Sequence, residues 1–223
     1  MKISVVIPAK DEAATIQEVI AGCRPFADEI LVVDGRSRDD TAALAQKAGA
    51  KVIADSGHGK GAAIRESIQH VQGEIVVFID ADCSHDPADI PKLIAPIREG
   101  NADHVSGSRL LGGSSELHGT FAEFMRLAGS AFITWCINAR FGVQLSESQN
   151  GFRAIRTDVF KKLDLRENIT TIEQEMIMET LRKGFRMGEV PTHEHKRKAG
   201  DSHIKLTRVW FRYGWCLVKK LWF

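Results

Sequence analysis

The sequence predicts an α/β fold in which helices flank a mostly parallel sheet. Short Val- and Ile-rich runs alternate with helical stretches through the first half of the chain, which is typical of successive strand–helix units. The apolar runs lack strict alternation of apolar and polar residues, as expected for strands buried on both faces of a parallel sheet. With 223 residues and 43% hydrophobic content, the chain suits one large domain with at most a short appendage. We therefore expect an open sheet with helices on both of its faces.

The first half of the chain supplies most of the expected strands. The Val- and Ile-rich runs place them at residues 2–7, 29–34, 51–54, 74–80 and 103–106. The stretches between them place helices at residues 12–22, 40–48, 60–71 and 86–99. Asp39 or Asp40 is expected to cap the second of these helices. Asp86 directly precedes Pro87 and is expected to cap the fourth.

The second half of the chain is less regular. A mostly apolar helical stretch spans residues 121–141, and a polar turn spans residues 146–153. The pattern then predicts helices near residues 157–163 and 171–183, a strand at 186–190 and a further helix from 205 onward. We therefore divide the chain into a domain at 1–203 and a basic amphipathic helix at 204–223.

Composition excludes several classes of protein. The net charge of +1 argues against nucleic acid binding over the whole surface, so no nucleic acid partner is expected. No run approaches the ~18 apolar residues of a membrane-spanning helix. The chain opens on Met1 and Lys2 and runs directly into a strand, so no secretory signal is expected. The cysteines are far apart and form no CxxC pair, which favours reduced thiols in a cytosolic protein over disulfides or a zinc site: Cys23, Cys83, Cys136 and Cys216.

Two aspartates mark the tip of the fourth expected strand. Asp80 and Asp82 follow an apolar run, and alternation along an extended chain puts both side chains on one side. Two unpaired carboxylates that are close to each other repel, and a divalent cation relieves the repulsion. Mg²⁺ or Mn²⁺, bound by carboxylate and phosphate oxygens, is the natural partner. The pair is therefore either a metal site or two solvated aspartates in the turn before the next helix.

Two further polar side chains fall where ligands bind in open α/β sheets, at the carboxyl ends of strands. Asp34 ends the second strand and is available for a base N–H or a ribose hydroxyl. Lys60 lies in a glycine-flanked loop, residues 58–61, which lacks the GxxxxGK[ST] pattern of a phosphate loop. The GxGxxG pattern of dinucleotide-binding proteins is also absent from the sequence.

Five motifs occur in one order along the chain: VVIPAKDE at 5–12, VVDGRSRDDT at 32–41, GKGAAIR at 59–65, IDADCSHDP at 79–87 and QNGFRA at 149–154. Together they resemble the inverting family 2 glycosyltransferases with the GT-A fold. Within that family the chain is most similar to the dolichyl- or polyprenyl-phosphate sugar synthases, over roughly residues 3–206. The resemblance implies transfer of a sugar from a GDP- or UDP-linked donor to a polyprenyl or dolichyl phosphate, with Mg²⁺ or Mn²⁺ as cofactor.

The resemblance also implies roles for individual residues. The nucleotide of the donor is assigned to Pro8, Ala9, Asp11, Glu12, Asp34, Lys60 and Asp80. The metal is assigned to Asp80 and Asp82, with Asp82 as the more direct ligand. The acceptor and its phosphate are assigned to Gln149, Arg153, Arg197, Ser202 and His203, and Arg109 is a further candidate for phosphate binding. The residues expected to act in catalysis are Asp82, Arg197, Glu173 and Glu175.

The sequence departs from the family's pattern at positions that bear on the substrates. Asp11 stands where the family often has Asn, and Glu147 stands where Asp is commoner. His203 stands where the lipid-phosphate synthases often have Lys. These departures leave the expected fold intact but leave the identities of donor and acceptor open.

The acceptor decides what the chemistry requires. Sugar transfer leaves negative charge on the nucleoside diphosphate, which a metal held by Asp82 and the Arg197 guanidinium would stabilise. A phosphate acceptor is already anionic and attacks unaided, whereas a hydroxyl acceptor needs a general base. Glu173 and Glu175 are the candidates for that base, unless they only form an exposed helix face. Direct displacement would invert the anomeric centre.

Other functions compete with transfer to a polyprenyl phosphate. The nearest is the same chemistry onto a soluble hydroxyl acceptor. A nucleotidyltransferase is disfavoured because no glycine-rich GxGxR-type loop follows the first strand. A non-catalytic, membrane-associated partner subunit is disfavoured by the Asp80 and Asp82 pair and by Arg197. The His193-Glu194-His195 run has no obvious third metal ligand, which favours a charged loop that closes over phosphates.

The C-terminal residues carry an excess of positive charge over negative charge. Residues 193–223 carry a net charge of +6 and the rest of the chain carries −5. On a helical wheel the basic stripe is Lys205, Arg208, Arg212 and Lys219, and the opposite apolar face is Leu206, Trp210, Tyr213, Leu217 and Leu221. Such a helix fits an anionic membrane surface, or it docks on the enzyme's own core or on a partner. We expect a cytoplasmic protein that is peripheral on the membrane, and leave open a homo-oligomer or a membrane partner subunit.

Overall fold

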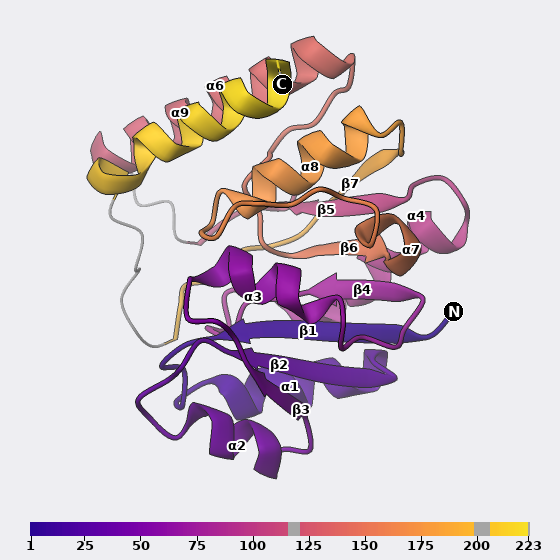
Figure 1. Cartoon of the computed structure of the whole chain (residues 1–223), viewed down its shortest axis with the longest axis vertical. Coiled ribbons are helices and arrows are strands. Elements are labelled where there is room, and N and C mark those ends of the chain that lie inside the picture. Colours follow the sequence, from indigo (N-terminus) through magenta and orange to yellow (C-terminus); the bar gives the residue numbers. More distant parts are fainter. Residues whose placement is uncertain (116–120, 199–205, 223) are drawn as a thin grey trace.

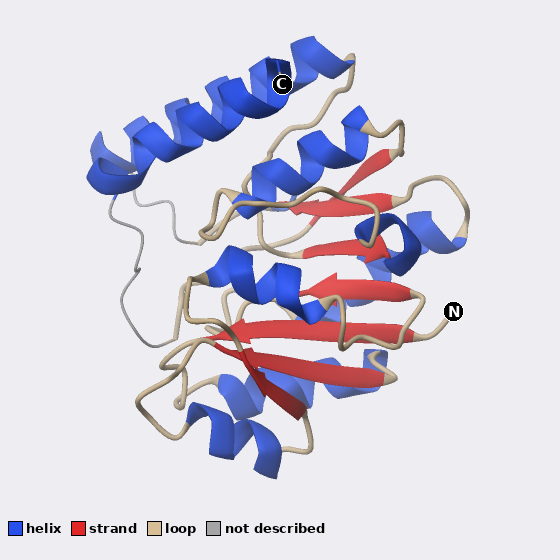
Figure 2. Cartoon of the chain, in the orientation of Figure 1, coloured by secondary structure: helices blue, strands red, loops and turns tan. Residues whose placement is uncertain are grey.

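A seven-stranded sheet forms the centre of the structure, a computed structural model that describes residues 1–115, 121–198 and 206–222. For residues 121–124, 126, 206–210 and 222 the description covers the backbone and not the side chains. The strands are β1 (Ile3–Ala9), β2 (Glu29–Asp34), β3 (Lys51–Ala54), β4 (Ile75–Phe78), β5 (His104–Ser108), β6 (Arg153–Arg156) and β7 (Met187–Pro191). They lie in the order β3-β2-β1-β4-β6-β5-β7. The expected α/β class and mostly parallel sheet are confirmed (Figure 2).

The antiparallel strand β6 is the main departure from the expected sheet. It lies between β4 and β5 and runs antiparallel to both, whereas the other neighbouring strands are parallel. The sequence places Arg153 at the end of a polar turn and predicts no strand there. Four residues with an arginine at each end give too little apolar periodicity to reveal a strand, although Ala154 and Ile155 are fully buried.

Helices cover both faces of the sheet, as expected (Figures 1 and 2). They are α1 (Ile16–Cys23), α2 (Thr41–Lys47), α3 (Lys60–Ser67), α4 (Ile90–Arg98), α5 (Arg109–Gly112), α6 (Phe121–Phe141), α7 (Thr157–Phe160), α8 (Ile172–Arg182) and α9 (Leu206–Trp222), with short 3-10 turns at Arg24–Phe26 and Pro87–Asp89. Asp86 accepts a hydrogen bond from the Ala88 amide at 2.9 Å, which confirms its capping role before α4. Before α2, the Asp39 carboxylate accepts from the Thr41 amide at 3.0 Å.

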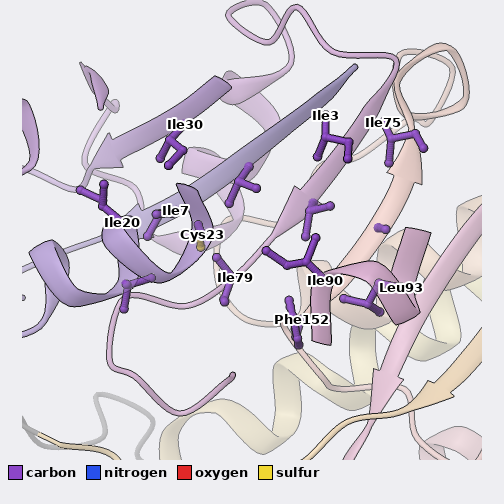
Figure 3. Packing of buried hydrophobic residues seen from close by; sticks show 14 of the residues in the cluster. Ile3, Ile7, Ile20, Cys23, Ile30, Ile75, Ile79, Ile90, Leu93 and Phe152 are labelled. Carbon is purple, nitrogen blue, oxygen red and sulfur yellow. The ribbon is translucent and has the colours of Figure 1, made fainter. Parts of the chain in front are cut away.

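The apolar residues of β1 serve both faces because successive side chains of a strand point in opposite directions. Ile3 and Ile7 belong to the cluster that contains Leu93 of α4 (Figure 3). Val6 belongs to the opposite cluster, together with Met176 of α8. Both faces of the strand are thus buried, which explains why its sequence shows no alternation of apolar and polar residues.

A third cluster joins α6 and α9 to α8, and α6 and α9 form an outer layer over α8 (Figure 1). It contains Ile137 of α6, Ile177 of α8, and Cys216 and Leu217 of α9. Tyr213 and Leu221 pack against it. The face of α9 that the helical wheel identifies as apolar is therefore covered by the protein itself, where the side chains are described. Within the described ranges no helix is both long and apolar enough to cross a bilayer.

Candidate functional site

The candidate site lies at the carboxyl ends of β1, β2 and β4. β1 pairs with both β2 and β4 in parallel register, so the three strand tips meet at one edge of the sheet. This edge gathers Pro8 and Ala9 from β1 and Asp34 from β2. Asp80 and Asp82 follow directly after β4. The fold thus brings residues from three of the sequence motifs to one place.

Lys60, the first residue of α3, joins two carboxylates of the site. Its ammonium nitrogen lies 2.6 Å from Asp80 Oδ1 and 2.8 Å from Glu173 Oε1. Burial alone would lower the pKa of Lys60, but the two carboxylates outweigh it and raise the pKa above its ordinary value. Burial would likewise raise the pKa of Asp80, and the Lys60 charge instead holds it below its usual range. Lys60 and Asp80 therefore stay charged at neutral pH, and Lys60 links Asp80 to Glu173 in one cluster.

Asp82 is held by the segment that follows β7. Its Oδ2 lies 2.9 Å from the Arg197 guanidinium, and its Oδ1 accepts the Ser84 amide at 3.0 Å. The backbone of the same segment bonds to the chain around Asp82, with the His195 amide donating to Ser84 O at 2.8 Å. The Lys198 amide donates to Asp82 O at 3.3 Å. Residues 194–198 therefore form a strap along residues 82–85.

The loop after β1 connects the site to the loop after β2. The Asp11 carboxylate accepts the Arg38 amide at 2.7 Å, and the Asp11 amide donates to Ser37 Oγ at 2.9 Å. Burial raises the pKa of Glu12 first, and the nearby Asp82 carboxylate raises it further. Glu12 is thus close enough to Asp82 for the two charges to repel, which makes this edge of the sheet attractive to a cation.

Asp34 has an unused acceptor. Its Oδ2 accepts the Ser37 amide at 3.2 Å. Its Oδ1 is buried and has no hydrogen-bond partner among the residues that are described. A buried carboxylate oxygen without a donor is costly, so this atom is suited to an N–H or O–H group of a ligand.

The residues predicted to bind the acceptor lie in different surroundings. Arg153 is 1% exposed and donates to the backbone carbonyls of Asn150 and, at 2.8 Å, Glu173. Arg109 lies 2.5 Å from a Glu147 carboxylate oxygen and 2.7 Å from one of Glu194. The structure therefore gives both arginines partners within the protein. Gln149 directly precedes Asn150 and is half-buried. The predicted residues Ser202 and His203 lie outside the described residues.

Glu173 and Glu175 point to different partners. Whereas Glu173 joins the Lys60 cluster, the Glu175 carboxylate lies 3.0 Å from the ammonium of Lys220 on α9. It also accepts the backbone amides of Arg166, at 3.0 and 3.1 Å, and of Glu167, at 2.8 Å. Since residues two apart on a helix do not face each other, the structure brings only Glu173 to the site.

Three residues near the site are not among the site residues that the sequence predicts. His85 is buried and stacks on Phe152, and its Nε2 lies 4.0 Å from Asp80 Oδ2. Burial lowers the pKa of His85. Glu147 and Glu194 clamp Arg109 from two sides. His85 lies inside the IDADCSHDP motif, and Glu147 stands out as a departure from the family's pattern, so both had a signal in the sequence.

The chemistry of the two aspartates fits a hard divalent cation. Their carboxylates offer oxygen ligands at the strand tip, and Mg²⁺ and Mn²⁺ prefer oxygen ligands. In the described part of the chain, no cluster of three or more His, Cys, Asp or Glu side chains has the geometry to hold a metal by itself. Asp80 and Asp82 would therefore share such an ion with oxygens of a bound diphosphate or with water.

The chain is similar to proteins of known family. Residues 4–164 match the family model described as glycosyl transferase family 2. The glycosyltransferase AglJ of Haloferax volcanii is 33% identical over 202 residues, which cover 89% of this chain and 65% of that protein. An undecaprenyl-phosphate 4-deoxy-4-formamido-L-arabinose transferase of Shewanella sediminis is 27% identical over 215 residues, covering 90% of this chain and 61% of that protein. The chain therefore spans less than two thirds of the length of these relatives.

A solved structure shares the fold. Glucosyl-3-phosphoglycerate synthase of Mycobacterium tuberculosis, in complex with Mn²⁺, UDP and glucosyl-3-phosphoglycerate, superposes with a TM-score of 0.80 at 24% identity. The match covers 99% of this chain and 80% of that one. At this level of identity the likeness shows the fold alone, and it confirms the expected GT-A architecture.

Proposed function

The chain belongs to glycosyl transferase family 2, and we propose that it transfers a sugar from a UDP- or GDP-linked donor to a polyprenyl phosphate, with inversion and with Mg²⁺ or Mn²⁺. The observation that carries the proposal is the pair of strand-tip aspartates, each matched with a cation: Lys60 on Asp80 and Arg197 on Asp82. A lipid phosphate acceptor is supported by the relative that is named an undecaprenyl-phosphate sugar transferase.

The site's own residues account for the chemistry of the leaving group. Lys60 and Arg197 place positive charge where the diphosphate of the donor would develop negative charge, and a pre-placed charge needs no reorganisation during the reaction. A divalent ion on Asp80 and Asp82 would add to this stabilisation when bound. The buried Asp34 Oδ1, which has no hydrogen-bond donor among the described residues, is suited to orient the nucleoside through a base N–H or a ribose hydroxyl.

Glu173 separates the proposal from its nearest alternative. A phosphate acceptor is anionic and needs no base, and Glu173 then serves to hold Lys60 in place. A soluble hydroxyl acceptor needs a base, and Glu173 is the candidate that lies in the cluster. Its contact with the Lys60 ammonium at 2.8 Å favours the first role, because this carboxylate oxygen is already engaged by a donor within the protein.

A donor-by-acceptor screen tests the proposed function. UDP- and GDP-sugars are incubated with Mn²⁺ or Mg²⁺ and either a short polyprenyl phosphate or the matching polyprenol. We expect release of nucleoside diphosphate that requires the lipid phosphate and stops when the metal is chelated. Equal release with the polyprenol, or with soluble sugars in place of lipid, would instead establish a hydroxyl acceptor.

We further propose that the outer helices place the enzyme on an anionic membrane surface. Apart from Met1, every large hydrophobic residue exposed in the described part lies on α5, α6 or α9: Leu110, Leu111, Met125, Phe132, Trp135, Phe211, Trp215 and Val218. The α9 sequence contains no acidic residue, and Arg140 and Arg212 are exposed on α6 and α9. Exposed aromatic residues beside basic ones suit the interface of an anionic bilayer. A lipid-linked phosphate would reach the enzyme at the same interface.

Replacing Phe211 and Trp215 together by Ser should reduce co-sedimentation with phosphatidylglycerol vesicles by about tenfold or more, because two exposed aromatic side chains are lost from the interface. Lys92→Ser, on the exposed side of α4, serves as the control and should pellet like the wild type. Unchanged pelleting of the double variant would contradict the membrane surface. A change from dimer to monomer in the same variant would assign these residues to a second copy of the chain instead.

A further inference from the structure

Lys220 is a buried charged residue that lies outside the candidate site. It is 6% exposed, and its ammonium lies 3.0 Å from Glu175 and 3.0 Å from Glu179, both of them fully buried. It also donates to the carbonyl of Asp164 at 2.8 Å. Burial alone would lower the pKa of Lys220, but the two carboxylates outweigh it and raise the pKa. The lysine thus stays charged and ties α9 to α8 and to the segment before α8.

That segment, residues 164–168, connects Lys220 to the start of α3. The Glu175 carboxylate, which Lys220 neutralises, accepts the amides of Arg166 and Glu167. The carbonyl of the next residue, Asn168, accepts the Gly61 amide at 2.9 Å. The two backbones touch here, since a Cβ on Gly61 would lie 2.8 Å from the carbonyl carbon of Asn168. Gly61 directly follows Lys60, so the position of this segment fixes the position of Lys60.

A second connection runs through the first turn of α8. The Tyr213 hydroxyl of α9 lies 2.6 Å from Thr170 Oγ1, and the Gln174 side chain donates to the Tyr213 carbonyl at 3.0 Å. Gln174 is the neighbour of Glu173, whose carboxylate pairs with Lys60. Both connections begin on α9 and both end at the Lys60 cluster.

We propose that Lys220 is a positioning residue for the donor site: through residues 164–168 and the first turn of α8, it holds the Lys60 ammonium against Asp80. The effect on the donor rests on the proposed function, whereas the effect on Lys60 does not. Without the lysine, two buried glutamates would lose their shared cation, and the segment that Glu175 holds would be free to rearrange.

The test compares two lysines that are adjacent on α9. Lys220→Met removes the buried charge, and Lys219→Met removes the neighbouring, half-buried one. Hydrogen exchange at the amides of Gly61 and Glu167 should be about tenfold faster in Lys220→Met and unchanged in Lys219→Met. The kcat/KM for the nucleotide sugar should fall about tenfold, because a displaced Lys60 would stabilise less of the charge that develops on the leaving diphosphate. Lys220→Arg should restore most of both properties.

Several outcomes would overturn the proposal. Unchanged exchange at Gly61 in Lys220→Met would show that the helix does not hold the site. Equal acceleration at Val5, which is fully buried in a strand paired on both sides, would make the effect a general loss of stability. If Lys220→Met does not fold, Glu175→Gln keeps the side-chain shape and weakens the link from Lys220 to the Arg166 and Glu167 amides, and normal Gly61 exchange in that variant would contradict the proposal. If no donor is turned over by the wild type, the exchange measurements still decide the matter.

Discussion

Asp82→Asn should lower kcat by about a thousandfold or more while the protein stays folded. The carboxylate lies at the strand tip with its Oδ2 2.9 Å from the Arg197 guanidinium, and it is one of the two that would hold the proposed metal. An amide has neither the charge that attracts a divalent cation nor the charge that holds Arg197 in place. A single change would therefore weaken two of the three proposed sources of positive charge for the leaving diphosphate, the metal and Arg197, and leave Lys60 in place.

The fold should tolerate this substitution. An asparagine keeps an oxygen that can accept the Ser84 amide, which Asp82 Oδ1 accepts at 3.0 Å. The backbone bond from the Lys198 amide to the carbonyl of residue 82 does not involve the side chain. We therefore expect a melting temperature within a few degrees of the wild type, since the hydrogen bonds from the Ser84 and Lys198 amides to residue 82 are kept.

Asp86→Asn is the matched control for Asp82→Asn. Asp86 lies four residues further along the same loop, is exposed, and caps the turn before α4 by accepting the Ala88 amide. Asparagine caps as well as aspartate, so this variant removes one charge nearby without touching the cluster. Binding of Mn²⁺ in the presence of UDP or GDP should be lost in Asp82→Asn and kept in Asp86→Asn. Wild-type turnover in Asp82→Asn would contradict a metal role for this residue.

The gathering of Lys60, Asp34 and Asp80 at one edge of the sheet could be anticipated from the sequence, because all three stand at the expected carboxyl ends of strands or just after them. Parallel strands carry such ends to one edge of a sheet whatever the details of packing. Long-range pairing could not be anticipated in the same way. β6 inserts antiparallel between β4 and β5, and its short run carries no local signal for that partner.

For Glu173 and Glu175 too, the sequence could not predict the long-range contacts. Helical geometry alone separates Glu173 from Glu175, because residues two apart lie on different faces. Geometry cannot say which of them faces the site, since this depends on how α8 packs on the sheet. The answer comes from partners that are distant in the sequence, Lys60 for Glu173 and Lys220 for Glu175.

The C-terminal helix illustrates how a helical wheel detects an apolar face without showing what covers it. Tyr213 and Leu217 form such a face in the sequence, and in the structure they pack with α6 and α8. The exposed side instead carries Phe211 and Trp215. Lys220 has its partners in a helix about 40 residues earlier, as its 41-residue separation from Glu179 shows, and no local pattern encodes that pairing.

Gly151→Ala should lower kcat/KM by about a hundredfold, the second largest effect that we expect. A Cβ at this position would lie 2.7 Å from the Lys60 ammonium and 2.8 Å from Asp80 Oδ2. It would also lie 3.2 Å from Glu173 Oε1, so the methyl group would enter the ion cluster itself. Gly151 does not have the positive φ that favours glycine, so the loss would come from this collision and not from backbone strain.

Hydrogen bonds on both sides of Gly151 hold its turn in place. The Asn150 side chain accepts the Phe152 amide at 2.9 Å, and the buried Arg153 guanidinium donates to the Asn150 carbonyl. The flexible Lys60 side chain must therefore give way, which separates it from Asp80 and Glu173 and displaces the charge that we propose faces the donor diphosphate.

Gly129→Ala provides the control, because the space around Gly129 in α6 is open to a Cβ. That variant should keep full activity and gain up to about 1 kcal/mol in the free energy of unfolding, since alanine is the better helix former. Gly151→Ala should instead lose about 1–3 kcal/mol from overpacking. Steady-state kinetics and denaturant unfolding of the two variants separate the effects. The methyl group of Gly151→Ala must displace at least one of the Lys60, Asp80 and Glu173 side chains. Normal kcat/KM in this variant would therefore mean that the Lys60 cluster does not contact the donor.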